Sequence, residues 1–301
     1  MKSSVALDKF LINQEVIGNT QETIEYYKKR IGYFVLFIED KSVNDITIED
    51  YNSYAIYLKN KISSKGTNLS SATIKTTLNA TKIFLKYAFD NKLMKEDIYT
   101  HIKPYKQVKK AIVVLSNEEI EKLLKSQNEF TIIGLRNLLA ISLMLDAGLR
   151  VSEVVNLNAE DVNKELGVIK VFGKGQKERL VPLTDSIKKY YDRYVFLTSN
   201  FGGALFKDIT SGERLTASGI SQILRRIKKE KGFTKLHPHY LRHTFATLFL
   251  VNGGDPIHLQ LILGHTTLYM TEQYLHLANQ MTLQKQKKYS PLTNIKKWIP
   301  V

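Results

Sequence analysis

The feature that most constrains the fold of this chain is the period of its apolar residues, which is helical almost throughout and changes to a strand period only once. Residues 167–172 and 178–183 are typical of two strands, and the glycine-containing segment 173–176 between them is typical of a tight turn. No strand pattern of comparable strength occurs in the first hundred residues. The sequence therefore predicts a mainly α fold with a small β-hairpin or sheet, in the α+β class.

The first hundred residues carry the start signals of three helices. Asn19 and Thr47 each precede an acidic residue by three positions, which is the pattern of a capping box, and Ser70 or Ser71 can cap a third helix. Apolar and aromatic residues recur at helical spacing after each start. We therefore expect a helical domain over residues 1–100.

The second half also begins with a helix signal, the capping box formed by Ser116 and Glu119. A strongly apolar helix is predicted over 132–145. It ends before Gly148, because glycine readily adopts the left-handed conformation that often follows a helix. A short helix restarts near 149–153. After the hairpin, two further helical segments are predicted: 216–231 and 239–251.

Length and charge restrict the classes of function. At 301 residues the chain can form two domains, each with its own core. Its 44 basic residues exceed its 29 acidic residues, which gives a net charge of +15 and a pI of about 9.6. This excess favours a polyanionic partner such as DNA or RNA, with a basic protein that binds neither as the alternative. The absence of cysteine excludes disulfides, thiolate catalysis and cysteine-based zinc sites.

No segment of the sequence points to a membrane. The N-terminal residues lack the uninterrupted apolar core of a signal peptide, and no run approaches the roughly 20 apolar residues of a membrane span. We therefore expect a soluble, cytoplasmic protein that has no membrane partner.

Basic charge is concentrated after residue 50. Residues 1–50 contain 6 basic and 9 acidic side chains, whereas residues 51–110 contain 12 basic and 3 acidic ones. A linker is predicted over 101–114, because this segment has a proline, four lysines and no apolar periodicity. Basic side chains of the linker and of the helix at 216–231 are candidates for phosphate contacts, with solvated charges as an equal alternative: Lys103, Lys106, Lys109, Lys110, Arg225 and Arg226.

A cluster of histidine, arginine and tyrosine near the C-terminus points to chemistry. The run His-Pro-His-Tyr-Leu-Arg-His at 237–243 is followed by Leu-Gly-His at 263–265 and by Tyr274. Arginine fits phosphate oxygens, histidine moves a proton near neutral pH, and a tyrosine hydroxyl can act as a nucleophile. These types predict attack on a phosphodiester. His239 and His243 have the spacing of a helical zinc pair, but their helix lacks carboxylates, so we expect no metal site there.

Each of these residues also has a structural explanation when it is considered alone. Arg150 can satisfy the last carbonyls of the preceding helix, and Arg242 can pair with a carboxylate such as Glu153 instead of a phosphate. Lys174 can be a solvated lysine of the hairpin turn, and Tyr274 is one of 16 tyrosines.

The order of the motifs is more specific than any one of them. Ala-Gly-Leu-Arg-Val-Ser-Glu at 147–153, Gly-Lys-Gly-x-Lys-Glu-Arg at 173–179 and His-x-Leu-Arg-His-Thr at 239–244 precede Leu-Gly-His at 263–265 and Tyr274. This order resembles the tyrosine recombinase family, which includes the phage integrases and the Xer-type enzymes. The length fits the two-domain, Xer-like kind.

The resemblance implies a role for each domain. Residues 1–100 correspond to a helical core-type DNA-binding domain, 101–114 to the linker and 115–301 to the catalytic domain. The implied partner is double-stranded DNA with a specific recombination site, on which four protomers exchange strands through a Holliday junction. In the family a C-terminal segment docks on a neighbouring protomer, with packing on its own domain as the alternative. Its candidate apolar anchors here are Leu292, Ile295, Trp298 and Ile299.

The resemblance also implies the chemistry of attack. Tyr274 attacks a DNA phosphodiester and forms a 3′-phosphotyrosyl bond. Arg150 and Arg242 stabilise the charge that develops on the phosphate in the transition state, so that no cofactor is required. Glu153 matches an acidic position that supports the site.

Proton transfer is assigned to other residues on the same basis. His265 donates to the phosphate, Lys174 protonates the leaving 5′-oxygen, and His239 assists proton transfer at the tyrosine. The remaining two histidines of the run, His237 and His243, are expected to be structural. A type IB-like DNA topoisomerase, which relaxes DNA without exchanging partners, and a DNA-binding regulator that does not cleave are the alternative functions.

Overall fold

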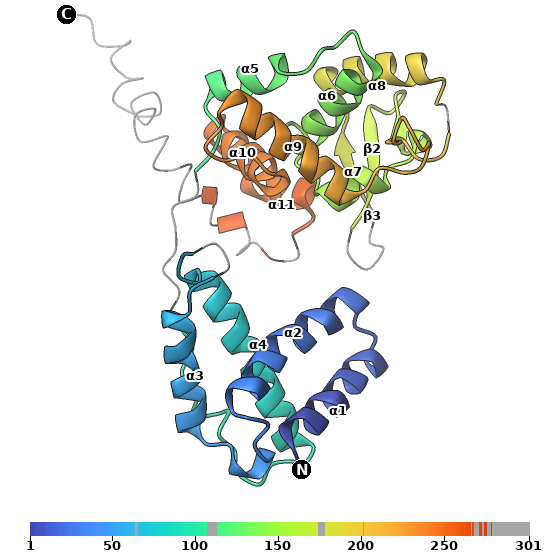
Figure 1. Cartoon of the computed structure of the whole chain (residues 1–301). Coiled ribbons are helices and arrows are strands. Elements are labelled where there is room, and N and C mark those ends of the chain that lie inside the picture. The colour runs from blue at the N-terminus through green and yellow to red at the C-terminus, as the bar shows by residue number, and fades with distance from the viewer. Residues whose placement is uncertain are drawn as a thin grey trace, which may run out of the picture. The chain divides into compact units, whose positions relative to one another are not determined.

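The computed structural model describes residues 1–63, 66–106, 113–173, 178–200 and 202–265, together with six later residues: Thr267, Thr271, Glu272, Tyr274, Leu275 and Ala278. The chain divides into two compact units, Met1–Lys110 and Ala111–Val301, and both consist mainly of helices (Figure 1). A three-stranded antiparallel sheet belongs to the second unit. This architecture confirms the predicted mainly α class with a small sheet. Among the described residues, no helix combines the length and apolar character that crossing a bilayer requires.

The first unit is a helical bundle around an aromatic core. Its elements are α1 (Ser3–Val16), α2 (Gln21–Phe37), the 3-10 turn η1 (Val43–Asp45), α3 (Ile48–Asn60) and α4 (Ser71–Asp90). Phe10 on α1 meets Phe84 on α4 edge-on, with ring centroids 6.1 Å apart. Phe34 on α2 packs against Tyr54 on α3 at 5.2 Å. All four rings are buried, so that this unit has a core of its own.

Side-chain caps set the helix starts of the first unit. Thr47 forms the predicted capping box at α3, and Ser70 caps α4. The prediction for Asn19 was wrong, because the hydroxyl of Thr20 caps α2. The Asn19 side chain instead donates a hydrogen bond to Gln14 near the end of α1, a helix that we did not predict.

In the second unit, helices pack around the three-stranded sheet. Its elements are α5 (Asn117–Lys125), α6 (Ile132–Leu145), α7 (Val151–Asn156), η2 (Ala159–Asp161), β1 (Val162–Asn163), β2 (Val168–Phe172), β3 (Glu178–Pro182), α8 (Asp185–Thr198), α9 (Ala217–Lys231), α10 (Pro238–Val251) and α11 (Pro256–Leu263). The capping box at Ser116 and the predicted antiparallel pair of strands are confirmed, and the predicted turn at 173–176 lies mostly outside the described residues. Ile169 on β2 pairs with Val181 on β3, and the short strand β1 extends the sheet beyond β2.

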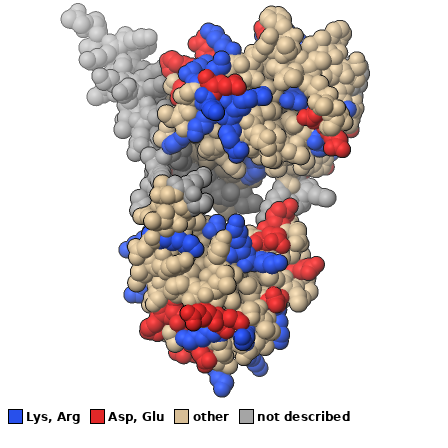
Figure 2. All heavy atoms as spheres, in the orientation of Figure 1, with Lys and Arg blue, Asp and Glu red and all other residues tan. Residues whose placement is uncertain are grey.

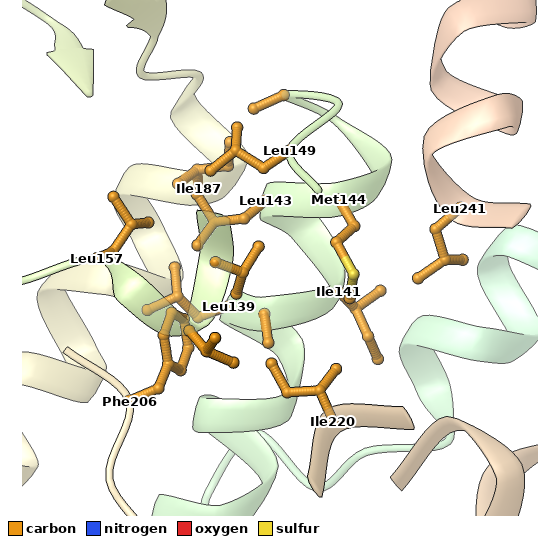
Figure 3. Close-up of a cluster of buried hydrophobic side chains, with 14 of the residues drawn as sticks. Leu139, Ile141, Leu143, Met144, Leu149, Leu157, Ile187, Phe206, Ile220 and Leu241 are labelled. Carbon is orange, nitrogen blue, oxygen red and sulfur yellow. The ribbon is translucent and has the colours of Figure 1, made fainter. Parts of the chain in front are cut away.

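Helix α6 lies in the core of the second unit. Its bounds match the predicted apolar run, and 11 of its 14 residues are buried. Figure 3 shows Leu139, Ile141 and Leu143 in a cluster that also includes Ile187 and Phe206 from other segments. Since α6 is enclosed on nearly all sides, packing holds its C-terminal end in place.

Gly148 turns the chain from α6 into α7. Its φ of +66° lies in the left-handed region, which glycine adopts without strain. A Cβ atom at this position would lie 2.4 Å from the Phe245 ring of α10. Glycine therefore permits both the turn and the close approach of α10, and the chain enters α7 at Arg150, within reach of side chains on α10.

Candidate active site

Arg150 and Glu153 are joined at the start of α7. The backbone N–H of Arg150 donates to Glu153 Oε2 at 2.7 Å, and its guanidinium Nη1 donates to Oε1 at 2.8 Å. The Glu153 side chain is 3% exposed, whereas that of Arg150 is 31% exposed. A buried carboxylate thus orients an arginine that still reaches the surface.

A second arginine, Arg179 on β3, binds the same carboxylate, and we assigned it no role from sequence. Its Nη1 and Nη2 donate to the two oxygens of Glu153, each at 2.9 Å, and its Nε donates to the Ile262 carbonyl at 2.7 Å. Burial alone raises the pKa of Glu153. The hydrogen bonds and charge of Arg179, with those of Arg150, outweigh burial and hold the pKa below its ordinary value. The sequence signal for this role was the position of Arg179 at the end of the motif at 173–179.

Arg242 on α10 is 5% exposed and is held mainly by backbone carbonyls. Its Nη1 donates to the Gly148 carbonyl at 2.6 Å, and its Nη2 donates to the Leu263 carbonyl at 2.8 Å. Glu153 Oε2 lies 3.8 Å from Nη1, so the carboxylate contributes a weaker ion pair. Burial and the nearby charge of Arg150 lower the pKa of Arg242 to about 10. The Arg242 guanidinium is therefore held in a fixed position, and the Glu153 carboxylate balances its positive charge only in part.

His265 connects Arg242 to Tyr274. Its Nε2 lies 3.3 Å from Arg242 Nη2, and its Nδ1 lies 3.0 Å from the Thr271 hydroxyl. Its ring stacks on the Tyr274 ring with an interplanar angle of 13° and centroids 6.4 Å apart. Burial, followed by the charges of Arg242 and Arg150, lowers the pKa of His265 to about 4. His265 is therefore neutral near pH 7.

The Tyr274 hydroxyl is bound by His243, which we expected to be structural. Tyr274 is 2% exposed, and its hydroxyl oxygen lies 2.7 Å from His243 Nδ1. His239, the predicted proton-transfer residue, is exposed and forms no side-chain hydrogen bond with the residues that the structure describes. Its pKa is lowered by burial of part of its ring and by Arg242 and Arg150, which places it in the same electrostatic environment.

The other predicted residues that the structure describes are exposed lysines and arginines. Lys103 and Lys106 are exposed at the end of the first unit. Arg225 and Arg226 are exposed on α9, and Figure 2 shows basic side chains gathered over this helix. Several predictions lie outside the described residues: Lys109, Lys110, Lys174, Leu292, Ile295, Trp298 and Ile299.

The site carries an excess of positive charge. Three guanidiniums, those of Arg150, Arg179 and Arg242, surround the single carboxylate of Glu153, which leaves two positive charges in excess. Such an arrangement favours a phosphate group, whose oxygens match the donors of a guanidinium. In the part of the chain that the structure describes, no three His, Asp or Glu side chains gather as metal ligands would.

Comparisons with known proteins identify the family of this chain. The phage integrase family matches residues 113–281, and the phage integrase SAM-like domain matches residues 8–107. The tyrosine recombinase XerD of Oceanobacillus iheyensis is 30% identical over 286 residues, a match that covers 91% of this chain and 94% of that protein.

Two similar solved structures share the fold. A lambda integrase dimer bound to a COC′ core site has a TM-score of 0.75 and 20% identity, and the match covers 91% of this chain and 95% of that one. A lambda integrase tetramer bound to a Holliday junction has a TM-score of 0.72 and 19% identity, with 89% and 78% covered. The fold and the site define a site-specific tyrosine recombinase. The chain belongs to the phage integrase family, which matches more than half of its length.

Proposed function

We propose that this recombinase cleaves one DNA strand by attack of Tyr274 on a phosphodiester, which yields a 3′-phosphotyrosyl bond and a free 5′-hydroxyl. The observation that carries the proposal is the excess of two positive charges next to a tyrosine hydroxyl. Arg242 contacts His265, and His265 stacks on Tyr274, so that a phosphate bound by the arginines lies close to the nucleophile. Rejoining needs no external energy, because the covalent bond retains that of the phosphodiester.

The two catalytic arginines are Arg150 and Arg242, whose guanidiniums stabilise charge on the non-bridging oxygens in the transition state. Glu153 positions both, and Arg179 holds Glu153 in turn. His265 contacts the same phosphate. The family resemblance alone assigns protonation of the 5′-oxygen to Lys174 and associates His239 with proton transfer.

The substrate we propose is double-stranded DNA with a specific recombination site. We propose that the exposed basic side chains of the first unit and of α9 contact the DNA backbone, and that the protein is cytoplasmic. By analogy with the lambda integrase tetramer on a Holliday junction, four protomers assemble on the DNA. Residues 1–100 then act as the core-type DNA-binding domain and 101–114 as the linker.

We further propose that the C-terminal segment docks on a neighbouring protomer. The second unit has a cavity of about 550 Å³ whose lining is mainly apolar and aromatic, including Leu124, Tyr190 and Phe249. Leu292 and Trp298 of the C-terminal segment have the apolar character to fill it. The alternative is that these residues pack on their own domain. Oligomeric state distinguishes the two, because under this alternative Trp298→Ala leaves tetramer assembly on DNA unchanged.

A nicked suicide duplex tests the cleavage proposal. The duplex is selected by the protein from a randomised pool and carries a nick next to the cleavage point, so that the short released fragment diffuses away and the covalent adduct accumulates. We expect an adduct with the wild-type protein and none with Tyr274→Phe. An adduct that persists in Tyr274→Phe refutes the assignment of the nucleophile. Relaxation of supercoiled DNA without recombinant product points to a topoisomerase instead.

A further inference from the structure

The hydroxyl that the proposed function uses as nucleophile is bound by a histidine outside the set of expected site residues. His243 Nδ1 lies 2.7 Å from the Tyr274 oxygen, and the two rings lie 5.5 Å apart at 46°. His239 lies one helical turn earlier on α10 and on the same face. The structure thus offers two imidazoles of the same helix, and His243 is the one in contact with the reacting atom.

We propose that His243, rather than His239, positions the Tyr274 hydroxyl and accepts its proton when the tyrosine attacks DNA. This inference rests on the proposed function of Tyr274. The phenolic proton moves to His243 Nδ1, the phenolate oxygen forms the new bond to phosphorus, and the bond from phosphorus to the 5′-oxygen breaks. The 5′-oxygen keeps the electron pair of that bond and takes a proton from a separate donor, Lys174 in the proposal above. On rejoining, His243 returns its proton to the tyrosine.

The surroundings of His243 keep its imidazole able to accept. Burial is the largest cause of its lowered pKa, and the neighbouring histidines and Arg242 lower the pKa further. The ring is therefore neutral near pH 7, and Nδ1 can accept the phenolic hydrogen if Nε2 carries the ring proton. Tyrosine needs such an acceptor because its ordinary pKa is about 10. The titratable and charged groups that face His243 are His237, His239, Arg242, His265 and Tyr274.

The position of His239 fits a contact with DNA better than a contact with the Tyr274 hydroxyl. Its side chain is exposed and makes no hydrogen bond within the described residues, whereas Arg242 and Arg150 lie close enough to lower its pKa. An exposed imidazole beside two phosphate-binding arginines is placed to contact the DNA. If His239 and His243 have different roles, their replacement is expected to change the rate of adduct formation in different ways.

The test measures single-turnover adduct formation on the suicide duplex by the full chain. His243→Leu removes the acceptor, and His243→Asn restores a polar group that can hold the hydroxyl but cannot take its proton. A second duplex carries sulfur in place of the bridging 5′-oxygen. Because a thiolate leaves without a proton, defects in leaving-group protonation disappear on this substrate, and defects in activation of the tyrosine remain. His258→Leu, at a histidine whose side chain is 75% exposed, is the matched control.

We expect His243→Leu to form adduct about 100-fold more slowly than the wild type on both duplexes, in the range that general-base catalysis contributes. His243→Asn falls between the two, DNA affinity is unchanged, and His258→Leu matches the wild type. The wild-type rate falls on acidification as His243 becomes protonated, and this acid limb is absent from both His243 variants.

Three results overturn the inference. The first is a wild-type rate in either His243 variant. The second is a defect in the His243 variants that the sulfur substrate removes, which places their effect at the leaving group. The third is an acid limb that persists in His243→Asn and disappears in His239→Asn. If His243→Leu does not fold, the two asparagine variants decide the question by themselves. Loss of all adduct in Tyr274→Phe keeps the proposed function intact in each of these cases, whereas an adduct there defeats the function itself.

Discussion

Replacement of Glu153 by glutamine is the most direct test of how the arginine cluster is held. The carboxylate accepts four hydrogen bonds, two from Arg150 and two from Arg179. Glutamine is nearly the same size but carries no charge, and its amide nitrogen cannot accept. At least one guanidinium therefore loses its acceptor while it remains close to the other cations.

The size of the effect follows from burial. Removing one partner of a buried ion pair costs about 3–5 kcal/mol, because the remaining charge is left uncompensated. Arg150 is partly exposed and can recover hydration, so we expect about 3 kcal/mol from the loss at Arg179 and Arg242. For a domain of roughly 200 residues, this corresponds to a fall of about 6–12 °C in the melting temperature of the second unit.

Calorimetry of the full chain measures the change. The matched control is Glu121→Gln on α5, which breaks an ion pair with Lys125 whose side chains are 64% and 74% exposed. We expect less than about 1 kcal/mol for this control, because solvent screens an exposed pair. Equal melting temperatures for Glu153→Gln and Glu121→Gln would refute the claim that the buried carboxylate holds the cluster.

Three further predictions concern the elements around the site. Gly148→Ala places a Cβ atom 2.4 Å from the Phe245 ring and is expected to lower the free energy of unfolding by about 2 kcal/mol or more, measured by urea unfolding. Gly232→Ala, at the similar φ of +67° but in open space, is expected to cost about 1 kcal/mol, and equal costs would contradict the steric reasoning. Arg242→Lys loses the planar fork that spans two carbonyls, and we expect adduct formation to slow about 100-fold in single turnover; an unchanged rate would exclude a specific role for the guanidinium. Acidification from about pH 6.5 to 4 is expected to lower the free energy of unfolding, because the unfolded chain binds a proton at His265 that the folded chain refuses. This proton contributes about 1.4 kcal/mol per pH unit, and urea unfolding of His265→Asn must therefore show a shallower dependence.

Much of the fold could be predicted because its signals are local. The capping pair at Ser116 and the apolar run at 132–145 depend on neighbouring residues, and the structure places α5 and α6 there. The single change of period likewise located β2 and β3. The prediction at Asn19 was wrong because its side chain donates to Gln14, on a helix that we did not predict, while the neighbouring Thr20 caps α2.

The types and order of the site residues were determined by the sequence, and they were sufficient to identify the family. Which residue contacts which was decided only by the tertiary structure. Arg179 is a strand residue in the sequence, and it becomes the main partner of Glu153 because the hairpin packs beside the start of α7. His239 and His243 share one face of α10, so spacing alone does not separate them. Only the packing of Tyr274 against α10 determines that its hydroxyl meets His243.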